Sequence, residues 1–215
     1  MQATTTLPTN YRHQATLDLS KSRKALVGAV VSGIVLLVAV GWFLVQFTDL
    51  LRPSGLEGTT LRDILTTTPE GNRSITVPGR LIADVVVASV LVMLIHELVH
   101  GVFYWRFAGR RPTFGIKGLN VYVAAPEEVY FPRNQYVIVG MAPFVVLTLV
   151  GLLLIIIVPA VVVSTLILFI AFNAAGAAGD LLMSARLLSY SSDTLMQDSG
   201  TSVIIYGPEK SQRAA

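Results

Sequence analysis

Long apolar stretches without a charged side chain dominate the pattern of this chain. Residues 25–47 carry no charge and follow three basic residues, and residues 136–179 form a second uncharged stretch that is long enough for two helices. Pro159, near the middle of the second stretch, predicts a tight turn between these helices. A further apolar segment runs from about residue 81 to residue 105. Because about 20 apolar residues span the hydrocarbon core of a bilayer, the pattern predicts four transmembrane helices.

The composition agrees with a membrane protein and argues against several other classes. The chain has 215 residues, of which 53% are hydrophobic and only 13% are charged, and it has no cysteine. Soluble domains carry about 25% charged residues. Without cysteine, thiolate metal ligands and cysteine nucleophiles are excluded. The net charge of +3 fits basic cytoplasmic loops, and no basic-aromatic motif is present, so we expect no nucleic-acid partner.

The distribution of lysine and arginine predicts the orientation in the membrane. Twelve of the 16 basic residues lie in the N-terminal tail, in the loop 106–135 and from Arg186 to the C-terminus, and four lie in the loop after the first span. Since basic residues are enriched on the cytoplasmic side, we expect an integral protein of a prokaryotic cell membrane with both termini in the cytoplasm. The predicted segments are a cytoplasmic tail (1–24), a transmembrane anchor (25–47), an extracytoplasmic loop (48–80), a core with three transmembrane helices (81–188) and a cytoplasmic tail (189–215).

The second apolar segment contains the candidate chemistry, the sequence His96-Glu97-Leu98-Val99-His100. Histidines at i and i+4 lie on one helix face, about 6 Å apart, and suit two ligands of one zinc ion. Glu97 can reach a metal-bound water and remove its proton. This is the H-E-x-x-H arrangement of metallopeptidases. A structural or chance origin is the alternative, but ionisable groups in hydrocarbon are costly and usually functional.

A catalytic zinc needs a third protein ligand. The remaining histidine, His13, lies in the N-terminal tail, so a carboxylate is expected, and Asp84 and Asp180 are the other acids in the spans. Asp84 follows Arg80 by four residues, and we expect these two to form a structural pair. Asp180 lies about 28 Å down its helix, at the depth of the histidines. We therefore predict Asp180 as the third ligand; an acid reaching for headgroups or for Arg186 is the alternative.

Asn173 lies seven residues before Asp180, on nearly the same helix face. Its amide could bind a substrate backbone beside the metal, or it could equally join two helices. The residues between them, 174–179, are all alanine or glycine. Such small residues let helix backbones approach closely, which predicts packing of this helix on the helix of the histidines.

The loop 106–135 predicts β-structure. Apolar and polar residues alternate from Leu119 to Ala124, which predicts a strand. Residues 126–128 predict a turn, and Val129 to Phe131 predict the returning strand. Residues 114–116 could form a third strand. The edge of such a strand can pair with an extended substrate. Tyr122 and Val123 are therefore candidate substrate-binding residues, and a hairpin that merely covers the site is the alternative.

Four parts of the sequence carry a family resemblance: His96 to Gly101, Val129 to Tyr136, Pro143, and Asn173 to Asp180. With these the chain resembles the membrane family called putative zincin peptidases, over roughly residues 81–188. It is more distantly similar to the site-2 proteases, intramembrane metalloproteases that cut transmembrane substrates. The resemblance implies zinc on His96, His100 and Asp180, with Glu97 as the base. The Asn-Pro-Asp-Gly or Leu-Asp-Gly stretch of site-2 proteases is absent, so substrate choice is not implied.

Together these patterns predict an all-α membrane fold of four transmembrane helices, with a small β-hairpin in the cytoplasmic loop between the second and third. The expected function is that of an intramembrane zinc metalloprotease. Its partners would be the lipid bilayer and a membrane protein or peptide substrate, and no oligomeric state is indicated. The alternative is a non-catalytic membrane adaptor or inactive protease homologue that binds peptide segments.

Overall fold

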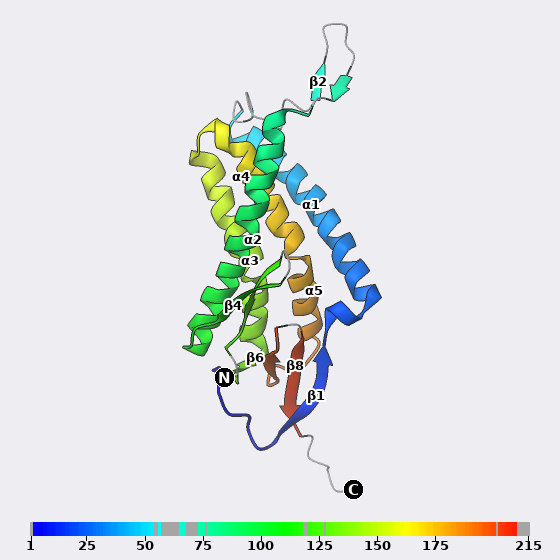
Figure 1. Ribbon diagram of the computed structural model, residues 1–215, viewed down its shortest axis with the longest axis vertical. Coiled ribbons are helices and arrows are strands. Elements are labelled where there is room, and N and C mark those ends of the chain that lie inside the picture. Colours follow the sequence, from blue (N-terminus) through cyan, green and yellow to red (C-terminus); the bar gives the residue numbers. More distant parts are fainter. Residues whose placement is uncertain are drawn as a thin grey trace. The chain divides into compact units, whose positions relative to one another are not determined.

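The chain is mainly helical, with small antiparallel sheets. The computed structural model describes residues 2–53, 56, 65–67, 73–75, 77–117, 120–126, 128–200 and 202–209. The helices are α1 (Arg23–Leu51), α2 (Gly79–Ala108), α3 (Arg133–Ile157), α4 (Ala160–Gly176) and α5 (Ala178–Leu187) (Figure 1). The strands are β1 (Tyr11–Leu17), β2 (Leu65–Thr67), β3 (Arg73–Ile75), β4 (Thr113–Lys117), β5 (Asn120–Ala124), β6 (Tyr130–Pro132), β7 (Leu195–Asp198) and β8 (Val203–Pro208).

Among the described residues, four helical segments are long and apolar enough to cross a membrane: Arg23–Leu51, Gly79–Ala108, Arg133–Ile157 and Ala160–Leu187. This confirms the four predicted apolar helices. Large aliphatic side chains remain exposed on them, for example Val38 at 65% and Leu153 at 66%. A helix that is apolar on all sides is typical of a membrane span, so these surfaces are compatible with a membrane protein.

The chain divides into two compact units. Unit 1 contains Met1–Val30, His96–Pro143 and Ala177–Ala215, and unit 2 contains Val31–Ile95 and Phe144–Gly176. Helices α1, α2 and α3 therefore contribute residues to both units. The candidate chemistry of α2 and α5 falls in unit 1.

A four-stranded antiparallel sheet, in the order β1-β8-β7-β6, organises unit 1. Strands β1 and β8 lie side by side and join the two tails of the chain, with Tyr11 opposite Pro208 (Figure 1). The side chains of β8 alternate between buried and half-buried, as expected for a strand with one face on a core. The expected all-α fold is therefore wrong in this respect, because the tails form a sheet.

The loop between α2 and α3 contains a β-hairpin, but its strands are not the predicted pair. Strand β5 pairs with β4, in the register Phe114 to Val123, while β6 pairs with β7 instead. Only two residues of the sequence separate β4 from β5, which is the commonest length of a hairpin connection. The piece at residues 114–116 is thus the true partner of β5. Leu119 and Glu127 lie outside the described residues.

The core of unit 1 joins the buried face of the sheet to α2, α3 and α5. Phe131 of β6 is completely buried, and its ring lies 5.5 Å from that of Tyr104 and 6.2 Å from that of Tyr136. Met196 and Ile205, from β7 and β8, are buried in the same cluster. The packing of these aromatic and aliphatic side chains fixes the tails beside the helix segments that carry the candidate site.

Unit 2 has its own aliphatic core of Leu44, Leu56, Ile155, Val163, Ile167 and Ile170. Several polar side chains of unit 2 hydrogen-bond to backbone carbonyl oxygens or to another side chain. The guanidinium of Arg52 donates to the carbonyl oxygens of Ile155 and Val158, at 2.9 and 2.7 Å. The hydroxyl of Thr165 donates to buried Asp84 at 2.7 Å, and Arg80 donates to the carbonyl oxygen of Val161. Asp84 therefore has a structural hydrogen bond with a partner, Thr165, that the sequence did not indicate.

Candidate metal centre

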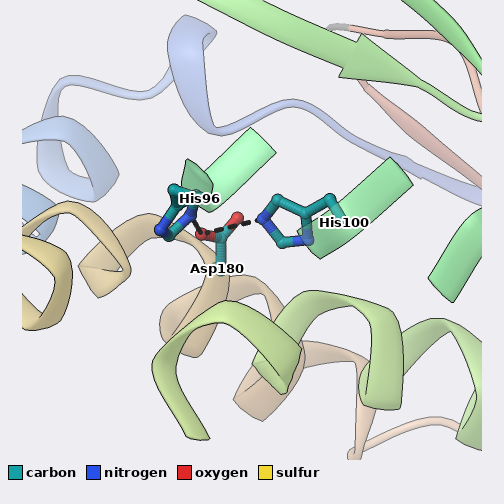
Figure 2. A group of neighbouring side chains, drawn as sticks. All are labelled: His96, His100 and Asp180. Carbon is teal, nitrogen blue, oxygen red and sulfur yellow. Dashed lines mark hydrogen bonds and ion pairs between the residues drawn. The ribbon is translucent and has the colours of Figure 1, made fainter. Parts of the chain in front are cut away.

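Two histidines from α2 and one aspartate from α5 meet in unit 1. Because His96 and His100 are one turn apart, their rings lie on the same helix face, with centroids 4.9 Å apart. Figure 2 shows the Asp180 carboxylate between the two rings, with its Oδ2 atom 3.2 Å from Nε2 of His96 and 3.6 Å from Nε2 of His100. One candidate ligand atom from each residue lies within 4.8 Å of the others. The three residues are thus close enough to bind one metal ion.

The hydrogen bonds of His100 test whether this donor set suits a cation. Its Nδ1 atom lies 2.9 Å from the carbonyl oxygen of Val139 on α3. A carbonyl oxygen only accepts, so Nδ1 carries the proton, and in the neutral ring Nε2 presents a lone pair to Asp180. Two acceptors that face each other at 3.6 Å repel each other, and a cation bound between them would remove this repulsion. Two imidazole nitrogens and a carboxylate oxygen are a zinc-type donor set, and a carbonyl that accepts the other ring N–H of a ligand histidine is typical of such sites.

Glu97 contacts the hairpin. Its Oε2 atom accepts the backbone N–H of Val123 at 3.0 Å. The N–H of Val123 therefore points away from β4, and by the alternation of an antiparallel ladder the N–H of Tyr122 points toward β4. Of the two predicted substrate-binding residues, Val123 is the one that faces the free edge of β5. Its N–H is already bound to Glu97.

A cavity of about 470 Å³ adjoins the metal cluster. Glu97, His100 and Asp180 border it, as do Tyr122 and Val123 of β5. All of its lining residues belong to unit 1. The candidate base, two of the candidate metal ligands and the edge strand therefore share one space, which is large enough for part of a ligand.

The cavity also contains polar residues that the sequence analysis missed. Tyr104 and Tyr136 border it, and so does Asp198 of β7. The spacing of Tyr104, four residues after His100, places it on the same helix face and was a signal that could have found it. Asp198 lies in the C-terminal tail, and only the pairing of β7 with β6 and β8 brings it here. No local pattern could have indicated that position.

The remaining predicted site residue, Asn173, lies in α4 and therefore in unit 2. Its side chain is completely buried. The predicted contact of its amide with a substrate beside the metal stays a prediction. Asp84 also lies in unit 2, so the residues that unit 1 gathers as candidate ligands are His96, His100 and Asp180.

Long apolar helices and a zinc-type donor set define the class of this protein as a candidate membrane metalloprotein. The comparison with known families is more specific. Residues 89–195 match the model of the family described as "Putative zincin peptidase". The match covers just under half of the chain and includes His96, Glu97, His100 and Asp180. It supports a zincin-like family, which suggests a metallopeptidase and implies zinc. No curated protein and no solved structure matches the chain.

Proposed function

We propose that the protein is an intramembrane zinc metalloprotease that hydrolyses peptide bonds of membrane or membrane-proximal substrates. The observation that carries this proposal is the cluster of His96, His100 and Asp180 beside a cavity that Glu97 also borders. The three residues of the cluster lie within two of the candidate membrane spans, Gly79–Ala108 and Ala160–Leu187, which supports a site at membrane depth. The match to the zincin family supports peptide-bond hydrolysis.

His96, His100 and Asp180 would hold the zinc ion. A zinc ion bound there supplies a Lewis acid, which polarises a carbonyl and makes water more acidic. Glu97 would accept the proton of the attacking water and deliver it to the leaving amine. Since Oε2 of Glu97 accepts the Val123 N–H, we assign Oε1 to this proton transfer. The backbone of β5 thus orients the base.

A substrate would have to enter in an extended form, because a helix hides its peptide groups in its own hydrogen bonds. The free edge of β5 supports such binding. In an antiparallel strand the N–H and C=O of one residue point to the same side. Val121 and Val123 would therefore offer carbonyl oxygens to a substrate backbone, with Tyr122 between them bordering the cavity. The rival reading, a hairpin that only covers the site, predicts no effect of changes at this edge.

We place the protein in a prokaryotic cell membrane, with both termini in the cytoplasm. The excess of basic residues in the tails and in the loop 106–135 supports this orientation. Its partners would then be the lipid bilayer and a membrane protein or peptide whose cleaved bond lies near the cytoplasmic face.

The test compares wild type with Glu97→Gln, which keeps the size of the side chain and removes the base. Proteomics of cells that express either form identifies substrates, and the purified proteins are then assayed on them. Both forms should hold about one zinc per chain in elemental analysis, and the variant should be at least about 100-fold slower. Glu128→Gln, at an exposed position outside the cavity, serves as the matched control.

Three outcomes distinguish a peptidase from a non-catalytic adaptor or inactive homologue. Cleavage by Glu97→Gln at the wild-type rate would refute the mechanism. Zinc binding by the wild type without cleavage of any protein would favour the non-catalytic adaptor or inactive homologue. Slow cleavage by Glu97→Gln with zinc retained is the result that the proposed function requires.

A further inference from the structure

Asp198, the last residue of β7, borders the cavity of the candidate metal centre. Its Oδ2 atom accepts the hydroxyl of Tyr104 at 2.5 Å, and its Oδ1 atom accepts the N–H of Gly200 at 2.7 Å. The hydroxyl of Tyr136 also interacts with this carboxylate. Because an ionised carboxylate has about four lone-pair positions, Asp198 can still accept a further hydrogen bond. Within the described part of the chain, no basic side chain forms an ion pair with it.

The cavity is lined by acidic side chains: Glu97, Asp180 and Asp198. Among the described residues, its lining contains three carboxylates and no lysine or arginine. Two of these carboxylates, Glu97 and Asp180, have roles at the proposed zinc site. Asp198 has no such role, and its half-buried carboxylate has no ion-pair partner among the residues that the structure describes. A charge in such a place is stabilised when a cation joins it.

The rest of the lining indicates the shape of that cation. Beside the tyrosines, the wall contains the apolar side chains of Leu19, Leu26, Met183 and Val203. An apolar wall with an acid at one point suits a long aliphatic stem with a charged end, as in lysine and arginine.

Helix geometry places this acid near the reacting peptide group. Tyr104 follows His100 by one helical turn, about 6 Å along the axis, and its hydroxyl contacts Asp198. An extended substrate advances about 3.3 Å per residue. A long side chain close to the scissile bond can therefore reach Asp198 while its backbone lies at the metal centre.

We propose that Asp198 determines specificity by binding the ammonium or guanidinium group of a substrate lysine or arginine close to the scissile bond. This inference rests on the proposed peptidase function and adds a substrate class to it: membrane segments that carry a basic residue at the point of cleavage. Basic residues gather at the cytoplasmic ends of membrane spans, so those ends supply suitable sites.

The test uses internally quenched peptides based on a cleaved sequence, in which one position at a time is lysine, arginine, methionine or glutamate. Methionine has a similar stem without the charge. For the wild type, kcat/KM should be about tenfold or more higher for lysine than for methionine at one position near the scissile bond. Asp198→Asn should reduce this ratio to near one, and Asp198→Lys should favour glutamate there. Glu209→Gln, an exposed acid that follows β8 and lies outside the cavity, should keep the wild-type ratio.

A binding measurement separates this inference from the proposed function. Labelled lysine and methionine peptides are titrated into the Glu97→Gln protein, with and without Asp198→Asn, after zinc content and elution volume show that each variant is folded. A tenfold preference for the lysine peptide that Asp198→Asn abolishes supports the subsite even if no peptide is cleaved. Equal affinity for both peptides, or a lysine preference that survives Asp198→Asn, overturns it. Failure of the wild type to cleave anything refutes the peptidase function alone.

Discussion

Gly101→Ala is a sharp test of how the hairpin acts on the candidate base. Gly101 directly follows His100 and is buried, and the ring of Phe114 from β4 lies over it. A Cβ atom at residue 101 would lie 2.6 Å from Cζ of Phe114, whereas ordinary contacts begin at 3.4 Å. The ring must therefore retreat by about 0.8 Å, the difference between these two distances.

The displacement should reach Glu97 through the register of the hairpin. Phe114 is the partner of Val123, whose N–H donates to Glu97 at 3.0 Å. If β4 and β5 move with the ring, this distance grows to about 3.8 Å, beyond the range of a hydrogen bond. Hydrogen bonds to charged groups contribute about 1.5–3 kcal/mol. We expect kcat to fall by about 10- to 100-fold, with zinc content unchanged.

The assay measures kcat and zinc content for Gly101→Ala, for Phe114→Ala and for the double variant, which removes the clash. The double variant should be faster than Gly101→Ala alone. Gly79→Ala is the matched control, because it lies on the same helix and a Cβ there meets no atom within 4 Å. Phe114 is 51% exposed, so its ring could instead swing into solvent alone. Wild-type kcat for Gly101→Ala would show this and would refute the predicted movement of the hairpin, while the orienting role of the Val123 N–H is tested by Val123→Pro.

Three further predictions address the metal, the edge strand and the orientation. Elemental analysis of Asp180→Ala should show a sharp loss of zinc, while Asp84→Ala should stay near one ion per chain; the reverse pattern would exchange the roles of the two acids. Val123→Pro removes the N–H that Glu97 accepts and should impair cleavage while zinc is retained, whereas normal cleavage would show that this N–H is dispensable. Reporter fusions to the tails, 1–24 and 189–215, should both report the cytoplasm, and opposite locations would mean that the number of membrane crossings is wrong.

The helices and the metal cluster were predictable because their determinants are local. A run of uncharged residues specifies an apolar helix without reference to the rest of the chain. The helical repeat places His96 and His100 on one face, and the scarcity of acids in the spans left Asp84 and Asp180 as candidates. The choice between these two needed only a comparison of depth along the helices.

The sheet was not predictable in the same way, because its pairings are long-range. Strand β1 pairs with β8, so that Tyr11 lies opposite Pro208, and short alternating segments in two polar tails give little sign of such a partner. The same cause led to the wrong partner for β6, which pairs with β7 rather than with β5. Asp198 was missed for this reason, since β7 carries it to the cavity.

The pairing of the two tails also has a consequence for biosynthesis. Strand β1 is at the edge of its sheet, and its neighbour there is β8, which the ribosome makes almost 190 residues later. A nascent chain can therefore complete all its apolar helices before β1 finds a partner. Part of the cavity wall emerges at the same late stage, since it is formed by Asp198, Gly200, Ser202 and Val203. Assembly of the cavity thus waits until residue 203 has been made, and a chain that stops earlier lacks part of the cavity wall.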